Sequence, residues 1–252
     1  MKSAVLMDKV INKEVLNIID DGTHKISSGA DLDINVKDDV KAILLLDSFS
    51  ENISVTLGNN SDVKIINYAC QADQDVVLQA YAKCVVINIL SRDSSQRYSL
   101  HEYSDLKLSN MTYMKSQEIK VNTSIDHLSR NANSLMLSKG VLEKSRLTIR
   151  GAVNIMAAAF GSNGFQKTEM LILDKESKAI SIPELNIKNH DVKCTHGAAI
   201  SSLDEEKMFY MQSRGIDYDD SKALVIQGFF NSLLADIPKD ITDDIMERLR
   251  RD

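Results

Sequence analysis

The chain has 252 residues, of which 43% are hydrophobic and 26% charged, and its formal net charge is −6. The apolar content is too high for a disordered chain and is enough for a globular core. No apolar stretch reaches the roughly 20 residues of a spanning helix, and Asp8 interrupts the start before a signal sequence develops. The acidic balance argues against nucleic-acid binding. We predict a cytoplasmic protein with no nucleic-acid and no membrane partner.

The N-terminal segment 1–28 is predicted to be helical. Apolar residues between Asp8 and Asp21 recur close to one helical stripe, and Gly22 follows as a C-cap. We therefore expect a short helix over residues 8–21.

From residue 29 to 200, short β-prone segments recur at a nearly fixed step. One set begins at Ala42, Val63, Val85 and Leu106, with steps of 21 or 22 residues, and a second set lies between its members. The step from Leu106 to the segment at Leu147 is 41 residues, which leaves room for one weakly marked copy near Leu128. Two short strands per fixed step are typical of a solenoid.

We therefore predict a mainly β protein, with a right-handed parallel β-helix over residues 29–200. Only two prolines occur in the chain, as expected where most backbone N–H groups must donate to ladder hydrogen bonds. An antiparallel β-sandwich also gives short strands at regular spacing and is the alternative.

The segment 201–252 is predicted to be a helical subdomain. Ser202 and Glu205 have the spacing of a capping box, and Gly215 would end the helix that they begin. A second helix is expected from about Asp219, and a third, short one from Asp240.

Cys194 and His196 are the residues with the clearest potential for metal chemistry. They are two positions apart, so a strand would place both side chains on one face. Thiolate and imidazole suit iron or an iron–sulfur cluster. The alternative is a buried cysteine beside a histidine that hydrogen-bonds to the chain end. The other two cysteines, Cys70 and Cys84, have apolar or small neighbours and are expected in the core.

The last third of the chain resembles the SufB/SufD family, the scaffold subunits of the SUF iron–sulfur cluster assembly machinery. The resemblance is carried by four motifs: Pro-Glu-Leu at 183–185, Cys-x-His-Gly-Ala at 194–198, Phe-Tyr-x-x-Ser-Arg-Gly-Ile at 209–216 and Gly-Phe at 228–229. The family is described as a β-helix flanked by helical segments, which agrees with the repeat.

The resemblance implies a scaffold that is not an enzyme. Family members dimerise through the β-helix and dock an ABC-type ATPase, SufC, on their C-terminal helices. A transient iron–sulfur cluster would then form at the dimer interface. Docking on 201–252 would involve five residues: Phe209, Tyr210, Arg214, Gly215 and Phe229. Alternatively, Phe209 and Tyr210 only plug the β-helix end, Arg214-Gly215 only form a helix C-cap and Phe229 belongs to the core.

His196 stands where SufD-type members place a functionally important histidine, which makes it the leading candidate ligand. SufB carries a cluster-site cysteine on the preceding strand, where this chain has Thr168. The neighbouring Glu169 would offer an oxygen ligand, or it is simply a solvated carboxylate. Compared with the family that it resembles, the chain is expected to be short and to lack most of the usual N-terminal helical domain. It would therefore be a SufD-like partner of a SufB-type scaffold, or a homodimer.

Two alternative functions stay open. A β-helix enzyme acting on polysaccharide would need paired carboxylates, for which Asp73 and Asp75 are the nearest candidates. A cluster-free adaptor that only regulates the ATPase would need no metal ligands.

Overall fold

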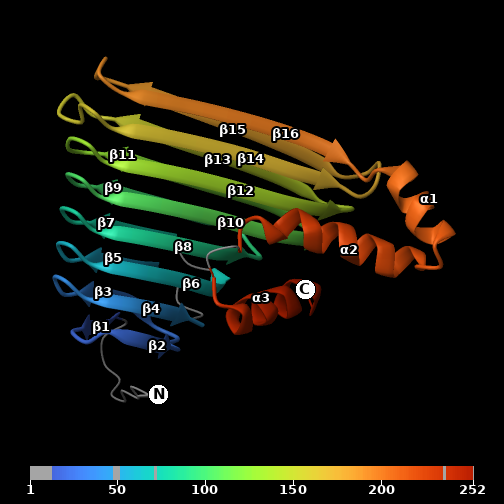
Figure 1. The fold of residues 1–252 in the computed structure, drawn as a ribbon, viewed down its shortest axis with the longest axis horizontal. Coiled ribbons are helices and arrows are strands. Elements are labelled where there is room, and N and C mark those ends of the chain that lie inside the picture. The colour runs from blue at the N-terminus through green and yellow to red at the C-terminus, as the bar shows by residue number, and fades with distance from the viewer. Residues whose placement is uncertain (1–12, 48–51, 71–72, 235–236, 252) are drawn as a thin grey trace.

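The computed structural model describes residues 13–47, 52–70, 73–234 and 237–251, in which sixteen strands precede three helices (Figure 1). Successive strands alternate between two sheets, each with eight parallel strands. The odd-numbered strands form sheet A: β1 Lys13–Ile18, β3 Asp31–Val36, β5 Asn52–Leu57, β7 Asp73–Leu78, β9 Ser94–Leu100, β11 Glu118–His127, β13 Arg146–Ile155 and β15 Lys178–Ile187. The even-numbered strands form sheet B: β2 Gly22–Ile26, β4 Lys41–Leu46, β6 Asp62–Cys70, β8 Lys83–Leu90, β10 Asp105–Lys115, β12 Asn133–Glu143, β14 Asn163–Ile172 and β16 Lys193–Ser202. The parallel β-helix prediction is confirmed, and the antiparallel sandwich is excluded.

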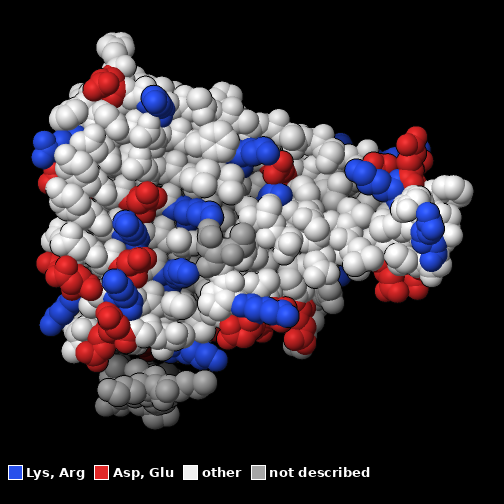
Figure 2. Space-filling view, in the orientation of Figure 1, with Lys and Arg blue, Asp and Glu red and all other residues white. Residues whose placement is uncertain are grey.

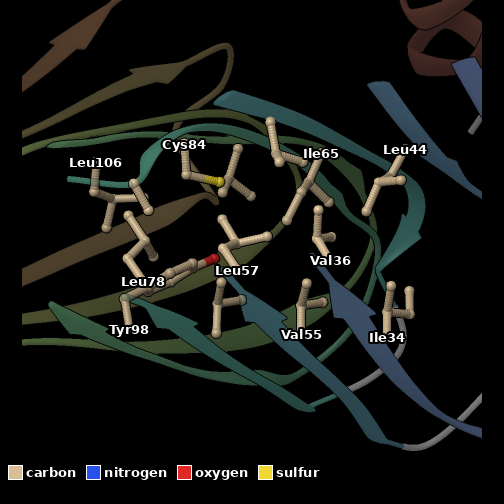
Figure 3. Packing of buried hydrophobic residues seen from close by; sticks show 14 of the residues in the cluster. Ile34, Val36, Leu44, Val55, Leu57, Ile65, Leu78, Cys84, Tyr98 and Leu106 are labelled. Carbon is tan, nitrogen blue, oxygen red and sulfur yellow. The ribbon is translucent and has the colours of Figure 1, made fainter. Parts of the chain in front are cut away.

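The core lies between the two sheets, because alternate residues of each strand point inward. Sheet B contributes Leu44, Ile65, Cys84 and Leu106, which face residues such as Leu78 from sheet A (Figure 3). Cys84 is buried, as predicted, whereas the Cys70 side chain lies outside what the structure describes.

The coils lengthen along the chain instead of keeping a fixed step. Val63 pairs with Cys84, a step of 21 residues, whereas Leu106 pairs with Ser134, a step of 28, and Ser134 pairs with Gly164, a step of 30. The predicted extra copy near Leu128 is therefore wrong. Strands β10, β11 and β12 have 10 or 11 residues, whereas β4 and β5 have 6, so the gap holds one long coil and not two short ones.

The predicted N-terminal helix is also wrong over the residues described. Lys13–Ile18 is strand β1, and it pairs in parallel with β3, while residues 8–12 lie outside the described part. Leu16 and Ile18 point towards the core and Val15 points away. The apolar residues of this segment fit the spacing of a helix as well as that of a strand, and the pairing of β1 with β3 decides in favour of the strand. The division of the chain at residues 28 and 200 stays a prediction.

The helices α1 Glu205–Ser213, α2 Tyr218–Asn231 and α3 Lys239–Arg251 follow the last strand. Helices α2 and α3 lie on the outer face of sheet B, while α1 extends beyond the end of the strands (Figure 1). Phe230 of α2 and Ile245 of α3 are fully buried against outward-facing apolar residues of sheet B, such as Ile66 and Met111. None of the described helices is long and apolar enough to cross a membrane.

The caps of α1 correct one sequence prediction. Ser202 ends strand β16, and Asp204 is the N-cap, because its carboxylate accepts hydrogen bonds from the N–H groups of Glu206 and Lys207, both at 3.1 Å. Gly215 follows the helix with φ of +88°, the left-handed conformation expected of a residue after a C-cap.

Candidate functional site

The last coil of the solenoid, formed by β15 and β16, has no described strand on its outer edge. Ile187 pairs with the buried Ile155, and Ile200 pairs with the buried Met170, so both isoleucines point towards the solenoid axis. They are nevertheless 46% and 48% exposed, because no further coil covers them in the described structure. An open sheet edge with an apolar centre is a surface suited to association with another chain.

Cys194 and His196 lie on this open coil and share its inward face, as their spacing predicts. Their neighbours one coil below are Gly164 and Gln166. Cys194 is half-buried and packs near Val153, and this burial raises the pKa of its thiol. Gly164 leaves room for the sulfur, since a Cβ at this position would lie only 3.1 Å from Cys194 Sγ.

The His196 side chain is exposed and hydrogen-bonds to none of the described residues. Beneath it, the buried Gln166 donates from Nε2 to the carbonyl oxygen of Glu184 at 2.9 Å, which fixes the floor of the site. An exposed imidazole on a rigid strand is free to bind a metal or a ligand brought by another chain.

Glu169 is separated from these two residues, because it lies on the outer face of β14. Its carboxylate contacts Lys167 Nζ at 2.7 Å and Lys139 Nζ at 3.3 Å. Partial burial alone would raise the pKa of Glu169, but the two lysines hold it below its usual value. The described residues contain no group of three His, Cys, Asp or Glu side chains able to hold a metal. The ligand role of Glu169 stays a prediction, and its lysine partners argue against it.

The helical residues predicted to bind a partner fall into two places. Phe209 and Tyr210 of α1 are 72% and 59% exposed, so they do not plug the β-helix. Arg214 stacks on Tyr210, with its guanidinium carbon 5.1 Å from the ring centroid, and Gly215 ends this helix. Phe229 of α2 is half-buried and packs against the outer face of sheet B, where Lys139 Nζ lies 4.6 Å from the centroid of its ring.

The structure adds two exposed apolar residues to this surface, Tyr218 at 48% and Leu224 at 49%. Together with Tyr210, Leu224 lines a groove between α1 and α2, whose other lining residues are Asp204, Glu206, Lys207, Met211 and Val225. The sequence held a signal for Leu224, because this residue falls off the apolar stripe that faces sheet B.

A second groove crosses the outer face of sheet A and contains Asp73 and Asp75, the candidates for polysaccharide chemistry. Asp31, Asp33, Lys13 and Arg97 also line it, and none of its lining residues is aromatic. Two of its carboxylates serve the fold: Asp33 pairs with Lys13 at 2.8 Å, and Asp73 accepts the Ser95 backbone N–H at 2.8 Å.

Residues 47–229 match the family model of the SufBD core domain, described as SUF system FeS cluster assembly. The chain belongs to the SufBD family. It is 30% identical to the iron-sulfur cluster assembly protein SufD of Escherichia coli over 130 residues, which are 51% of this chain and 31% of that protein. The SufBD family proteins ycf24 of two red algae are also similar. That of Porphyra purpurea is 30% identical over 151 residues, 60% of this chain and 29% of the relative. That of Antithamnion is 28% identical over 192 residues, 76% of this chain and 60% of the relative.

The matches to these three proteins thus span between 29% and 60% of the relatives' lengths. The family match includes the last coil with Cys194 and His196, helix α1 and most of α2. The resemblance read from the sequence motifs is therefore confirmed at the level of the family.

Proposed function

We propose that this SufBD family member is a non-catalytic scaffold subunit on which an iron–sulfur cluster is assembled as cargo. The observation that carries the proposal is the open last coil, which exposes His196 and half-exposes Cys194 beside uncovered apolar residues. A cluster needs about four ligands, and one chain offers two here. A second chain on the same coil would supply the others.

The second chain is either another copy or a SufB-type scaffold. In a homodimer, two-fold symmetry would bring two Cys194–His196 pairs to one interface. In a heterodimer, the partner would bring the cysteine that this chain replaces by Thr168. In both cases β15 and β16 would pair with or pack against the partner's last coil, which would cover Ile187 and Ile200.

The helices α1 and α2 would bind a SufC-type ABC ATPase. This docking proposal is supported by the exposed apolar surface of Phe209, Tyr210 and Leu224, which nothing in the described structure covers. This surface follows directly after β16, so a movement of the docked ATPase would act on the coil that carries His196.

Anaerobic reconstitution with iron and sulfide tests the cluster role. The complex of the chain with its scaffold partner should give absorption and Mössbauer spectra of a bound cluster, and the His196→Ala variant should lose most of it. His190→Ala, another exposed histidine, serves as the matched control. A cluster that survives unchanged in His196→Ala would remove the ligand assignment, and no cluster in any complex would leave the alternative of a cluster-free adaptor.

Co-purification with the SufC-type ATPase tests the docking role. The pair should associate at micromolar concentration and raise the ATPase rate, and the Phe209→Ala/Tyr210→Ala variant should weaken both effects. Absence of any association would refute the docking.

A further inference from the structure

The tip of the helical hairpin, residues 204–220, carries most of the net charge of the molecule. It holds six acidic and two basic residues, a net charge of −4 against −6 for the whole chain. Charged side chains gather on this protruding tip (Figure 2). Because the tip extends beyond the sheets, its field reaches solvent on several sides.

Most of these acids are not neutralised by the chain itself. Glu205, Glu206, Asp219 and Asp220 are exposed and form no salt bridge with any described residue. The two basic residues are both engaged: Lys207 Nζ contacts Asp204 at 3.1 Å, and Arg214 stacks on Tyr210.

The same hairpin carries exposed apolar residues. Phe209, Tyr210 and Leu224 are all about half exposed or more, and the groove lined by Tyr210 and Leu224 is also lined by two acids, Asp204 and Glu206, and by one basic residue, Lys207. Aromatic and aliphatic anchors with polar and charged residues beside them are typical of a protein-binding surface.

We infer that the partner of this tip presents a basic surface around an apolar projection that enters the groove between α1 and α2. The inference rests on the proposed docking of the ATPase and states the chemistry that its contact surface must have. Opposite charges across the contact would raise the association rate, while the apolar residues would set the lifetime of the complex.

The test compares association rates of wild type and a neutralised tip with the SufC-type ATPase. The variant Glu205→Gln/Glu206→Gln/Asp219→Asn/Asp220→Asn keeps both N-caps, Asp204 and Asp217. Wild-type association measured by stopped flow should slow at least about tenfold as salt rises from about 0.05 to 0.5 M. The variant should associate about tenfold more slowly at low salt, lose most of the salt dependence and keep a similar dissociation rate.

A control with the same change in net charge is Asp20→Asn/Asp75→Asn/Asp105→Asn/Glu176→Gln, which neutralises four exposed acids of the solenoid. It should behave like wild type. Circular dichroism of both variants checks that α1 and α2 remain folded, since acids near helix N-termini also stabilise helices. Tight binding without salt dependence, or equal slowing in both variants, would overturn this inference but not the docking. No binding by wild type would overturn both.

Discussion

His127 shows how one buried residue makes the stability of the solenoid depend on pH. Its ring is fully buried inside the solenoid, with Nε2 2.8 Å from Ser134 Oγ. Burial lowers the pKa of His127 to about 4, although the Ala132 carbonyl and Asp126 act in the opposite direction. In the unfolded chain the imidazole of His127 binds a proton near pH 6.5, whereas in the folded chain it stays neutral down to about pH 4.

We therefore expect the free energy of unfolding to decrease as the pH is lowered from 6.5 to 4. The slope is about 1.4 kcal/mol per pH unit, and the total contribution of His127 is about 3 kcal/mol. Above pH 6.5 the residue is neutral in both states, so its contribution is constant. Urea unfolding at several pH values measures this, and His127→Gln should be less sensitive to acid by about that amount.

Ser134→Ala separates burial from hydrogen bonding as the cause. This variant should be less stable at every pH, yet it should retain the wild-type acid slope, because the imidazole stays buried. Parallel curves for wild type and His127→Gln would contradict the assignment.

At the scale of elements, the sequence predicts Ser202 as the N-cap of α1, whereas the structure has Asp204 there. Asp204→Ala should increase amide hydrogen exchange of the first turn of α1 severalfold, because its carboxylate accepts two backbone N–H groups there. Ser202→Ala, in the last residue of β16, should leave that exchange unchanged. The opposite pattern would restore the predicted capping box.

Helix α2 is held on sheet B by lysines at both of its ends. Lys139 Nζ donates to the Phe229 carbonyl oxygen at 2.7 Å and to Ser232 Oγ at 2.9 Å, and it is only 12% exposed. Near the other end, Lys222 Nζ binds Glu143 at 2.9 Å. Lys139 and Glu143 are both on β12, so one strand anchors the whole helix.

Replacing Lys139 by Met should therefore destabilise the docked helix by about 1–3 kcal/mol. The expected signature in native-state hydrogen exchange is faster exchange of α2 than of the coils below it. Lys120→Met, an exposed lysine of β11, is the control and should change neither. Uniform destabilisation of the whole chain by Lys139→Met would argue against a local clasp.

The sequence predicted elements well where the local pattern and the fold demand the same thing. The first β-helix coils, the three C-terminal helices and the shared face of Cys194 and His196 follow from period and spacing. The N-terminal stripe failed because β1 is defined by its pairing with β3, a contact that no local window contains. The prediction of a fixed step failed for a similar reason. By sequence pattern alone, Leu147 and Val153 belong to two separate β-prone segments, but both lie in one long strand, β13.

The corners between sheet A and sheet B show what spacing alone cannot reveal. From the corner after β3 to the corner after β13, each turn from sheet A to sheet B has one residue in the left-handed conformation, and two of these are tyrosines, Tyr81 and Tyr103. Asn, Asp and Gly adopt it readily, whereas aromatic residues rarely do. The two rings stack at 4.9 Å, and each tyrosine N–H donates to the carbonyl oxygen of the next coil, so the stack of coils maintains a conformation that the residues alone disfavour.

At the scale of the whole molecule, the two sheets differ in their surroundings. The outer face of sheet B is covered by α2 and α3, while the outer face of sheet A carries salt bridges such as Arg150 with Glu184 and faces solvent. The candidate docking and cluster sites both lie at the C-terminal end of the solenoid. This arrangement places the exposed imidazole of His196 on the strand that continues into α1, so the two proposed functions share one element.

Association through the last coil follows from the exposure of its inward face. Ile187 and Ile200 are already about half exposed in the single chain, so replacing both with Glu should leave its stability nearly unchanged. The same change would bury two charges in the proposed interface, which is strongly unfavourable. In light scattering at micromolar concentration, we expect wild type, alone or with a SufB-type scaffold, to form a dimer that Ile187→Glu/Ile200→Glu does not form. Phe160→Glu, at a corner residue of similar exposure (46%), should still dimerise. If both variants dimerise like wild type, the chains meet elsewhere and the ligands of the cluster must be sought away from Cys194 and His196.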